Sequence, residues 1–98
     1  MKVEIVAADG TTWSGNATYV RVPGQRGHIG ILPGHQPMLV ALTDGTARVV
    51  PDQHPEFEIP VGRGYAFVTA RNIAVLPLGH SGGNALDWLS SFPGVIRR

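Results

Sequence analysis

The sequence predicts an all-β fold, a β-sandwich or flattened barrel of about eight to ten short strands. Thirteen glycines and eight prolines are spread along the chain, so they mark many turns and do not separate two domains. Apolar and polar residues alternate with period two in several of the runs between these turns. A sheet with one apolar face has to bury that face, and two sheets packed face to face achieve this most simply.

Two segments alternate most clearly, near residues 2–7 and 56–61. Each has a dry face of apolar side chains and a wet face of charged or proline residues. The dry positions are Val3, Ile5, Ala7, Phe57, Ile59 and Val61, and the wet positions are Lys2, Glu4, Glu56, Glu58 and Pro60.

Further strands are predicted where β-branched and aromatic residues gather. These segments are residues 17–22, 46–50, 64–70 and 73–76. Dipeptides typical of turns lie between such runs, namely Asp9-Gly10, Asp44-Gly45 and Arg71-Asn72.

The end of the chain differs, and we assign residues 1–80 to the sandwich and 81–98 to a linker with a short helical tail. Ser81-Gly82-Gly83 predicts a flexible joint, and Asn84 is a candidate N-cap for a helix-like stretch over 85–92. Because so short a helix is not stable alone in water, it either docks on the sandwich or on a partner, or it frays.

Composition excludes several classes of function. The 98 residues carry a net charge of +1, too little to hold a phosphate backbone or an anionic membrane, so we expect no nucleic-acid partner. The absence of cysteine excludes disulfides, thiolate chemistry and cysteine zinc sites. Neither a signal segment nor a membrane-spanning run is present in these residues, and we expect a cytosolic or peripheral protein.

Residues that could carry catalysis are sparse. No Gly-x-Ser-x-Gly elbow nominates a nucleophile, and Glu56 and Glu58 lie on the wet side of a predicted strand, where solvation explains them. We therefore predict no catalytic, cofactor-binding or metal-binding residues, and no nucleotide binding.

Two rival functions are kept open. One is a small metal- or ligand-binding β-sandwich, although its histidines lack the close pairing of zinc ligands. The other is an oligonucleotide-binding barrel that combines arginines with tyrosines as stacking platforms. The residues concerned are His28, His35, His54 and His80 in the first case, and Arg21, Arg26, Arg48, Arg63, Tyr19 and Tyr65 in the second.

The segment from Val22 to Leu39 is the most specific feature of the chain. Pro33-Gly34 suits the central positions of a type II turn, because proline presets φ and glycine accepts the positive φ that follows. A rigid loop that presents apolar residues beside His28 and His35 suits protein recognition. The apolar residues are Ile31, Leu32 and Met38; for Ile31 and Leu39, an inward-facing corner of the core is an equally good interpretation.

Residues 1–80 resemble the N-terminal β-sandwich of the ATP synthase epsilon subunit. The resemblance lies in several short motifs that follow one another in register. They are Trp13-Ser14-Gly15, Val22-Pro23-Gly24, the stretch from Gly27 to Pro37 with its Leu32-Pro33-Gly34-His35 core, Ala41-Leu42, Thr43-Asp44-Gly45, residues 61–68 and residues 72–76.

The resemblance implies a flattened sandwich of two roughly five-stranded sheets that is not an enzyme by itself. It implies a rotor subunit that couples the gamma subunit to the c-ring, so that proton flow drives ATP synthesis, with no cofactor. The expected place is the cytoplasmic face of a bacterial plasma membrane, with the stromal face of a thylakoid as the alternative. The implied partner-binding residues are Arg26, Gly27, His28, Ile29, Gly30, Ile31, Leu32, Pro33, Gly34, His35 and Met38.

Two departures from the family pattern are visible. His28 stands where members of the family often carry an acidic residue, so a basic partner loop would be repelled beside Arg26 when the imidazole is protonated. Members usually continue into a two-helix hairpin, whereas residues 85–92 are too few to form one. We therefore expect the inhibitory arm of the family to be missing.

Overall fold

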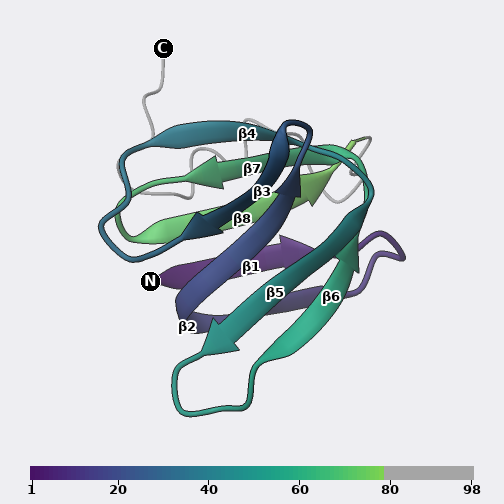
Figure 1. The fold of residues 1–98 in the computed structure, drawn as a ribbon. Helices are drawn as coiled ribbons and strands as arrows, with labels where there is room; N and C mark the ends of the chain where they lie inside the picture. Colours follow the sequence, from purple (N-terminus) through teal and green to yellow (C-terminus); the bar gives the residue numbers. More distant parts are fainter. Residues whose placement is uncertain (79–98) are drawn as a thin grey trace.

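The computed structural model describes residues 1–78, and these form strands and turns without a helix (Figure 1). The all-β prediction is thereby confirmed for this part of the chain. The predicted linker and helical tail over 81–98 lie outside the described residues. The strands are β1 (Lys2–Val6), β2 (Thr12–Gly24), β3 (Gly27–Ile31), β4 (Met38–Leu42), β5 (Gly45–Pro51), β6 (Phe57–Val61), β7 (Gly64–Val68) and β8 (Asn72–Pro77).

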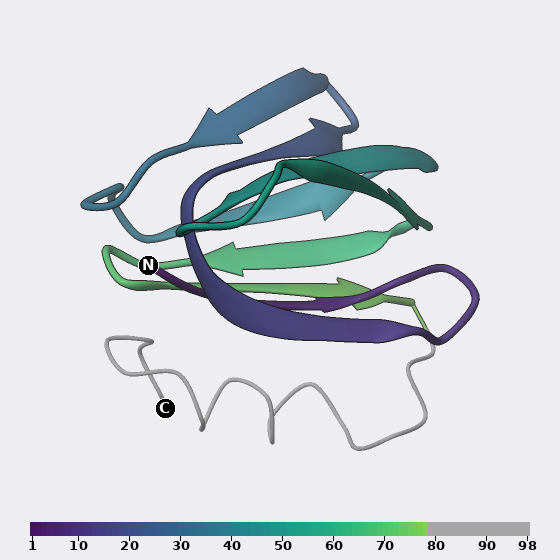
Figure 2. The same ribbon diagram turned by 90° about the horizontal axis from the view of Figure 1, so that it is seen from below.

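The strands pack as two layers that share β2. The N-terminal half of β2 continues into β1, β8, β7 and β4, and its C-terminal half lies between β3 and β5, with β6 beyond β5. Figure 2 shows β2 leaving the lower layer and curving into the upper one. The hydrogen-bonded network is therefore one continuous eight-stranded sheet folded on itself. The predicted sandwich is confirmed, and no helix in the described part is long and apolar enough to cross a membrane.

The core lies between the two layers and follows the predicted alternation, apart from Val6, which lies on the face of Lys2 and Glu4 and is also buried. Val3, Ile5 and Ala7 are buried, whereas Lys2 is exposed. In β6 the side chains of Ile59 and Val61 are buried, and Phe57 packs against the core from its edge. The six other strands, β2, β3, β4, β5, β7 and β8, supply the remaining core residues. These are Ala17, Val20, Val22, Ile31, Val40, Leu42, Ala47, Val49, Ala66, Val68, Ile73 and Val75.

An exposed ion pair joins β5 to the residue that precedes β6. Arg48 Nε donates a hydrogen bond to Glu56 Oε2, which agrees with the predicted wet position of Glu56. This hydrogen bond, and then the arginine charge, lower the pKa of the Glu56 carboxyl from its ordinary value. Because the Arg48 and Glu56 side chains are 39% and 52% exposed, water screens the pair and it contributes little to stability.

We expect the Arg48→Gln variant to return the pKa of Glu56 towards its ordinary value. A lowered folded-state pKa means that the pair stabilises the fold above the unfolded-state pKa, and that this contribution is lost as pH falls through the folded-state pKa. Carbon NMR titration of the carboxyl groups measures the shift. Asp9 is the internal control, because the Thr11 backbone amide, and not Arg48, lowers the pKa of Asp9. An unchanged Glu56 titration in the variant would contradict this cause.

Candidate functional site

The loop between β3 and β4 is built on the predicted turn. Gly34 has a φ of 87°, and His35 N donates a hydrogen bond to Leu32 O at 3.3 Å, which closes the four residues around Pro33-Gly34. This geometry confirms the type II turn. Leu32 precedes the turn and is 60% exposed, so the turn presents a large apolar side chain to the surroundings.

A second hydrogen bond fixes this turn to the body of the sandwich. Gly34 N donates to Ala70 O at 2.8 Å, in the connection between β7 and β8. That connection is itself closed by Thr69 and Asn72, because Thr69 N donates to Asn72 O at 2.8 Å and Asn72 N donates to Thr69 Oγ1 at 3.1 Å. Both residues are buried. The loop is thus held by backbone contacts at its apex, and its geometry is set before any partner arrives.

Gly34→Ala is expected to lower the free energy of unfolding by about 1–2 kcal/mol, because an alanine in the left-handed region brings its Cβ close to the carbonyl oxygen. A Cβ at Gly34 meets nothing within 4 Å, so the cost comes from φ alone. Asparagine tolerates this region better, so Gly34→Asn should lose less. Urea unfolding measures the difference, and equal losses in the two variants would contradict a conformational origin.

His35 also has a fixed place in the loop. Its Nδ1 lies 2.7 Å from Gln36 O, and because a carbonyl oxygen can only accept, Nδ1 carries the proton of this hydrogen bond. The ring is half-buried. His35 therefore helps to fix the loop conformation, and its Nε2 is free to accept a hydrogen bond when the ring is neutral.

Most of the remaining predicted site residues lie along β3, which is a strand and not part of a loop, whereas Arg26 lies in the turn before it and Met38 begins β4. β3 forms a hairpin with β2 around Gln25 and Arg26, and Gly27 follows with a φ of 123°. The predicted residues therefore extend over the whole strand, from Arg26 at one end to the Pro33-Gly34 turn at the other. The exposed ones are Arg26, Gly27, His28, Gly30, Leu32, Pro33 and Gly34, and the half-buried ones are Ile29, His35 and Met38.

Ile31 and Leu39, which the sequence placed equally well in the core or on the surface, differ in burial. Ile31 is fully buried in the core, so its side chain is not available to a partner. Leu39 is 60% exposed, and the inward interpretation is wrong for it. Its neighbour Val40 is 5% exposed, so strand alternation was the signal that could have placed Leu39 outside.

Gly30 is needed for close packing between neighbouring strands. A Cβ at this position would lie 2.7 Å from the hydroxyl oxygen of Tyr19 and 3.0 Å from its ring. Tyr19 comes from β2 and lies beside Gly30 on the outer face of the sheet, so a larger residue would displace its ring. Substitution of Gly30 thus changes the sheet as well as the surface.

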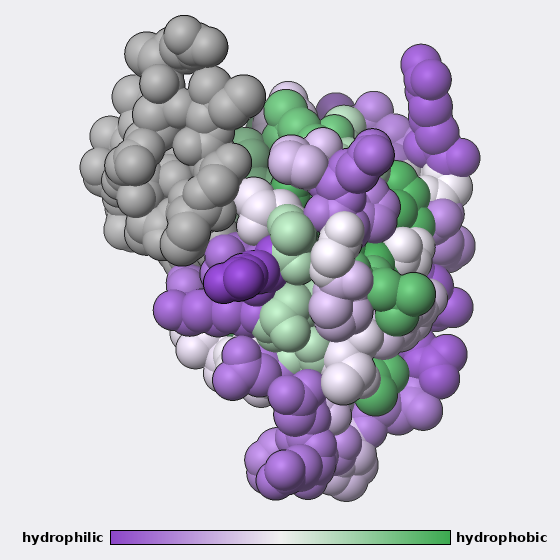
Figure 3. Space-filling model, turned by 90° about the vertical axis from the view of Figure 1, so that its left-hand side faces the viewer, coloured by the Kyte–Doolittle hydropathy of each residue, from purple (hydrophilic) through white to green (hydrophobic). Residues whose placement is uncertain are grey.

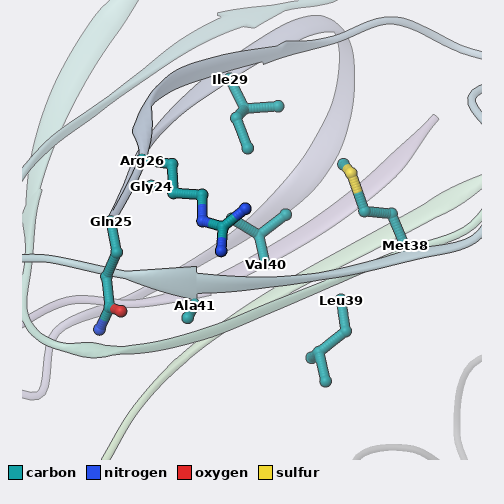
Figure 4. A pocket seen from close by; sticks show the side chains of 8 residues that line it. All are labelled: Gly24, Gln25, Arg26, Ile29, Met38, Leu39, Val40 and Ala41. Atoms are coloured by element: carbon teal, nitrogen blue, oxygen red, sulfur yellow. The ribbon is translucent and has the colours of Figure 1, made fainter.

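A groove lies between the β2–β3 hairpin and β4, with a volume of about 260 Å³. Figure 4 shows the Arg26 side chain pointing into it, towards Val40 and below Ile29. The lining residues are Gly24, Gln25, Arg26, Ile29, Met38, Leu39, Val40 and Ala41. Sequence reasoning named three of these, Arg26, Ile29 and Met38, and missed the groove because it forms only where two distant segments meet.

Hydrophobic surface near the loop is patchy. Figure 3 views the side of the molecule that is on the left in Figure 1, where the connection between β3 and β4 lies. Hydrophobic patches alternate there with weakly polar and hydrophilic surface. Such a mixed surface is ordinary for a folded protein and does not by itself mark an interface.

Within the described residues the two rival functions find little support, although Arg21 lies opposite Arg48, on the same face of the sheet as Tyr19. Within residues 1–78, no group of three or more histidine, aspartate or glutamate side chains could hold a metal ion, and His80 lies outside this range. Tyr19 belongs to β2 in one layer and Tyr65 to β7 in the other, so they form no common stacking platform. Arg48 is already paired with Glu56.

Comparison with known proteins identifies close relatives of this domain. Residues 1–77 match the family model of the ATP synthase delta/epsilon chain β-sandwich domain. The chain is similar to "ATP synthase epsilon chain 2" of Ralstonia nicotianae, with 37% identity over 76 residues, which cover 78% of this chain and 55% of that protein. It is also similar to the ATP synthase epsilon chains of Nocardia farcinica and Rhodococcus erythropolis, with 38% and 39% identity over 77 residues, which cover 78% of this chain and 59% and 63% of theirs. The match thus spans less than two thirds of each of these relatives.

Proposed function

Because the chain belongs to the ATP synthase delta/epsilon family through the β-sandwich domain of residues 1–77, we propose that it is a central-stalk subunit of a proton-driven F-type ATP synthase. In this proposal it binds the gamma subunit and the c-ring and couples their rotation. An epsilon chain is an accessory subunit of ATP synthase, so family membership confirms the prediction that the chain is not an enzyme on its own.

One observation carries the proposed coupling role: the turn at Pro33-Gly34 is exposed and yet fastened to the sandwich. A coupling element has to transmit force. If its contact loop were flexible, part of the rotation would deform the loop and would not reach the partner. Here the hydrogen bond from Gly34 N to Ala70 O ties the loop to a connection between two core strands. Leu32 then offers an apolar anchor that loses little entropy on binding.

The proposed contact surface is narrower than the sequence suggested. We assign the c-ring contact to the loop residues Leu32, Pro33, Gly34 and His35, which lie together at one end of the sandwich. The Arg26 end of the hairpin is assigned to gamma, because the length of β3 separates it from the loop. In this arrangement Ile31 supports the loop from the core and makes no contact with either partner.

We place the chain at the cytoplasmic face of a bacterial plasma membrane, held there through its complex. The relatives named above come from bacteria, which favours this place over the stromal face of a thylakoid. The match spans only part of those relatives, so the activity and the partners of the whole protein are themselves part of what we propose.

Capture of the cognate partners by the tagged chain tests the proposal. The purified gamma subunit and the purified c-ring are presented separately and together, and we expect stoichiometric capture of both. Gly30→Asp would not be a clean probe, since it displaces Tyr19. His35→Ala leaves the core untouched and should weaken capture of the ring more than capture of gamma. A folded chain that captures neither partner would overturn the proposal.

A further inference from the structure

One edge of β4 lacks a strand partner over most of its length. β4 pairs with β7 from end to end, whereas its other edge meets β2 only where Leu42 lies opposite Gly24. At that point Gln25 N donates to Ala41 O at 2.9 Å, so the backbone groups of Ala41 face away from β7. Because these directions alternate along an antiparallel strand, the N–H and C=O of Leu39 face the same free edge. Among residues 1–78 no strand pairs with Leu39 there.

This edge also lacks the features that usually protect a free edge. Natural edge strands are blunted by charged residues, by proline or by bulges. The outer edge of β6 has Glu58 and Pro60, both exposed, and Ala8 N donates to Pro60 O there at 3.1 Å, whereas β4 reads Met-Leu-Val-Ala-Leu without a charge. An uncharged and unpaired edge tends to take up another strand.

The groove described above opens beside this edge and is mostly apolar. Its inner wall is formed where Ile29 of β3 approaches Val40 of β4 beneath Gly24: a Cβ on Gly24 would lie 3.3 Å from Ile29 Cδ1 and 3.4 Å from Val40 Cγ1. The charge at its mouth is Arg26, whose side chain points into the groove in Figure 4. Within the described chain Arg26 forms no ion pair.

We propose that the free edge of β4 takes up an extended segment of a partner protein as an added β-strand beneath the β2–β3 hairpin. The backbone of the segment pairs with the N–H and C=O of Leu39. One apolar side chain of the segment enters the groove between Ile29, Met38 and Val40. A carboxylate of the segment faces Arg26, because a buried apolar contact beside an unpaired guanidinium favours an acidic neighbour.

The inference rests on the proposed function in one respect, since it takes the partner from the same complex. Gamma is the partner that we test, because the proposed ring contact lies at the other end of β3. The mode of binding adds what the family assignment does not supply: backbone pairing, the edge that is used, and the side-chain chemistry of the segment.

The first measurement is amide hydrogen exchange in the full chain, free and bound to purified cognate gamma. We expect the Leu39 amide to exchange readily in the free chain and at least about tenfold more slowly in the complex. A Leu39 amide that is protected in the free monomer would mean that the chain covers this edge itself, and would overturn the proposal. Protection that appears only on self-association would identify a second copy as the occupant and would equally overturn it.

Proline substitution separates backbone pairing from side-chain contact. Leu39→Pro removes the N–H at a position where β7 does not use it, so the fold should be retained, and affinity for gamma should fall about tenfold. Leu39→Ala keeps the N–H, so its affinity for gamma should fall less than threefold. The matched control is Glu58→Pro: Pro60 O accepts from Ala8 N and so faces away from β5, and by alternation the Glu58 N–H faces the same outer edge of β6. This control should bind normally.

Reversing the charge of Arg26 tests whether the bound segment carries a carboxylate beside it. Arg26→Glu should weaken binding to gamma several-fold at low salt, and Arg63→Glu, an exposed arginine between β6 and β7, should not. If Leu39→Pro binds gamma as tightly as the wild type and its neighbours gain no protection, strand addition is overturned while the proposed function stands. If the folded wild type does not bind gamma at all, both fail.

Discussion

Gly64→Ala is expected to destabilise the fold by about 3 kcal/mol, or to prevent folding. Gly64 begins β7 and pairs with Leu42 on one side and with Pro77 on the other. A Cβ built on Gly64 would lie 1.9 Å from the carbonyl oxygen of Leu76, and 2.8 Å from the Cα of Pro77. These are backbone atoms of a paired strand, so they can move away only if the ladder between β7 and β8 opens.

The neighbouring glycine supplies the control for this prediction. A Cβ on Gly62 would meet its nearest atoms at 3.7 Å, which is ordinary van der Waals contact. Gly62→Ala should therefore leave the free energy of unfolding nearly unchanged, or raise it slightly through lower entropy of the unfolded chain. Urea unfolding of both variants measures the difference. If Gly64→Ala were as stable as Gly62→Ala, the close approach of β8 to β7 at this point would be wrong.

Leu32→Asp is expected to lower affinity for the c-ring by about 2 kcal/mol, which corresponds to roughly thirtyfold. Leu32 is 60% exposed and lies at the start of the anchored turn, so the substitution removes an apolar anchor without disturbing the core. The thermal midpoint of unfolding of the Leu32→Asp variant should stay close to that of the wild type. The effect should appear mainly as faster dissociation.

The control for Leu32→Asp is the same change at a leucine elsewhere on the surface. Leu78 is 56% exposed and follows the far end of β8, away from the turn at Ala70 to which the loop is fastened. Leu78→Asp should bind the ring like the wild type. Equal losses in the two variants would mean that added charge, and not the loop, determines the affinity.

The sequence predicts the local features of this fold well and the long-range ones poorly. The Pro33-Gly34 turn was predictable because its φ requirement is local and only glycine meets it cheaply. The alternating faces of β1 and β6 were predictable because period two is a property of the strand itself. Both depend on residues that are close in sequence.

The N-terminal half of β2 shows why other parts were missed. Residues 12–16 include Ser14, Gly15 and Asn16, which do not favour strands, yet they pair with β1 along its whole length. Gly15 lacks a side chain, which leaves room for the ring of Trp13: a Cβ there would lie 2.9 Å from the ring. Trp13 in turn packs edge to face on Phe57, with ring centroids 5.1 Å apart. Pairing and packing partners that are distant in sequence thus override the local preference.

The candidate site divides in the same way. The anchored turn follows from its own residues, whereas β3 was taken for a loop because glycines and apolar residues interrupt one another there. Its strand conformation is imposed by β2, which pairs with it from Val20 to Gly24. The groove and the free edge of β4 could not be predicted, since they arise where the hairpin lies over a strand of the other layer.

Proton-driven ATP synthesis in membrane vesicles tests the coupling role most directly. Complexes stripped of this chain are supplied with the wild type, with Leu32→Asp or with Leu78→Asp, and the yield of ATP is measured at a fixed proton gradient. We predict that the wild type and Leu78→Asp restore synthesis, and that Leu32→Asp restores little of it at the same concentration. Full restoration by Leu32→Asp, or no restoration by the folded wild type, would contradict the proposal that this loop couples gamma to the ring.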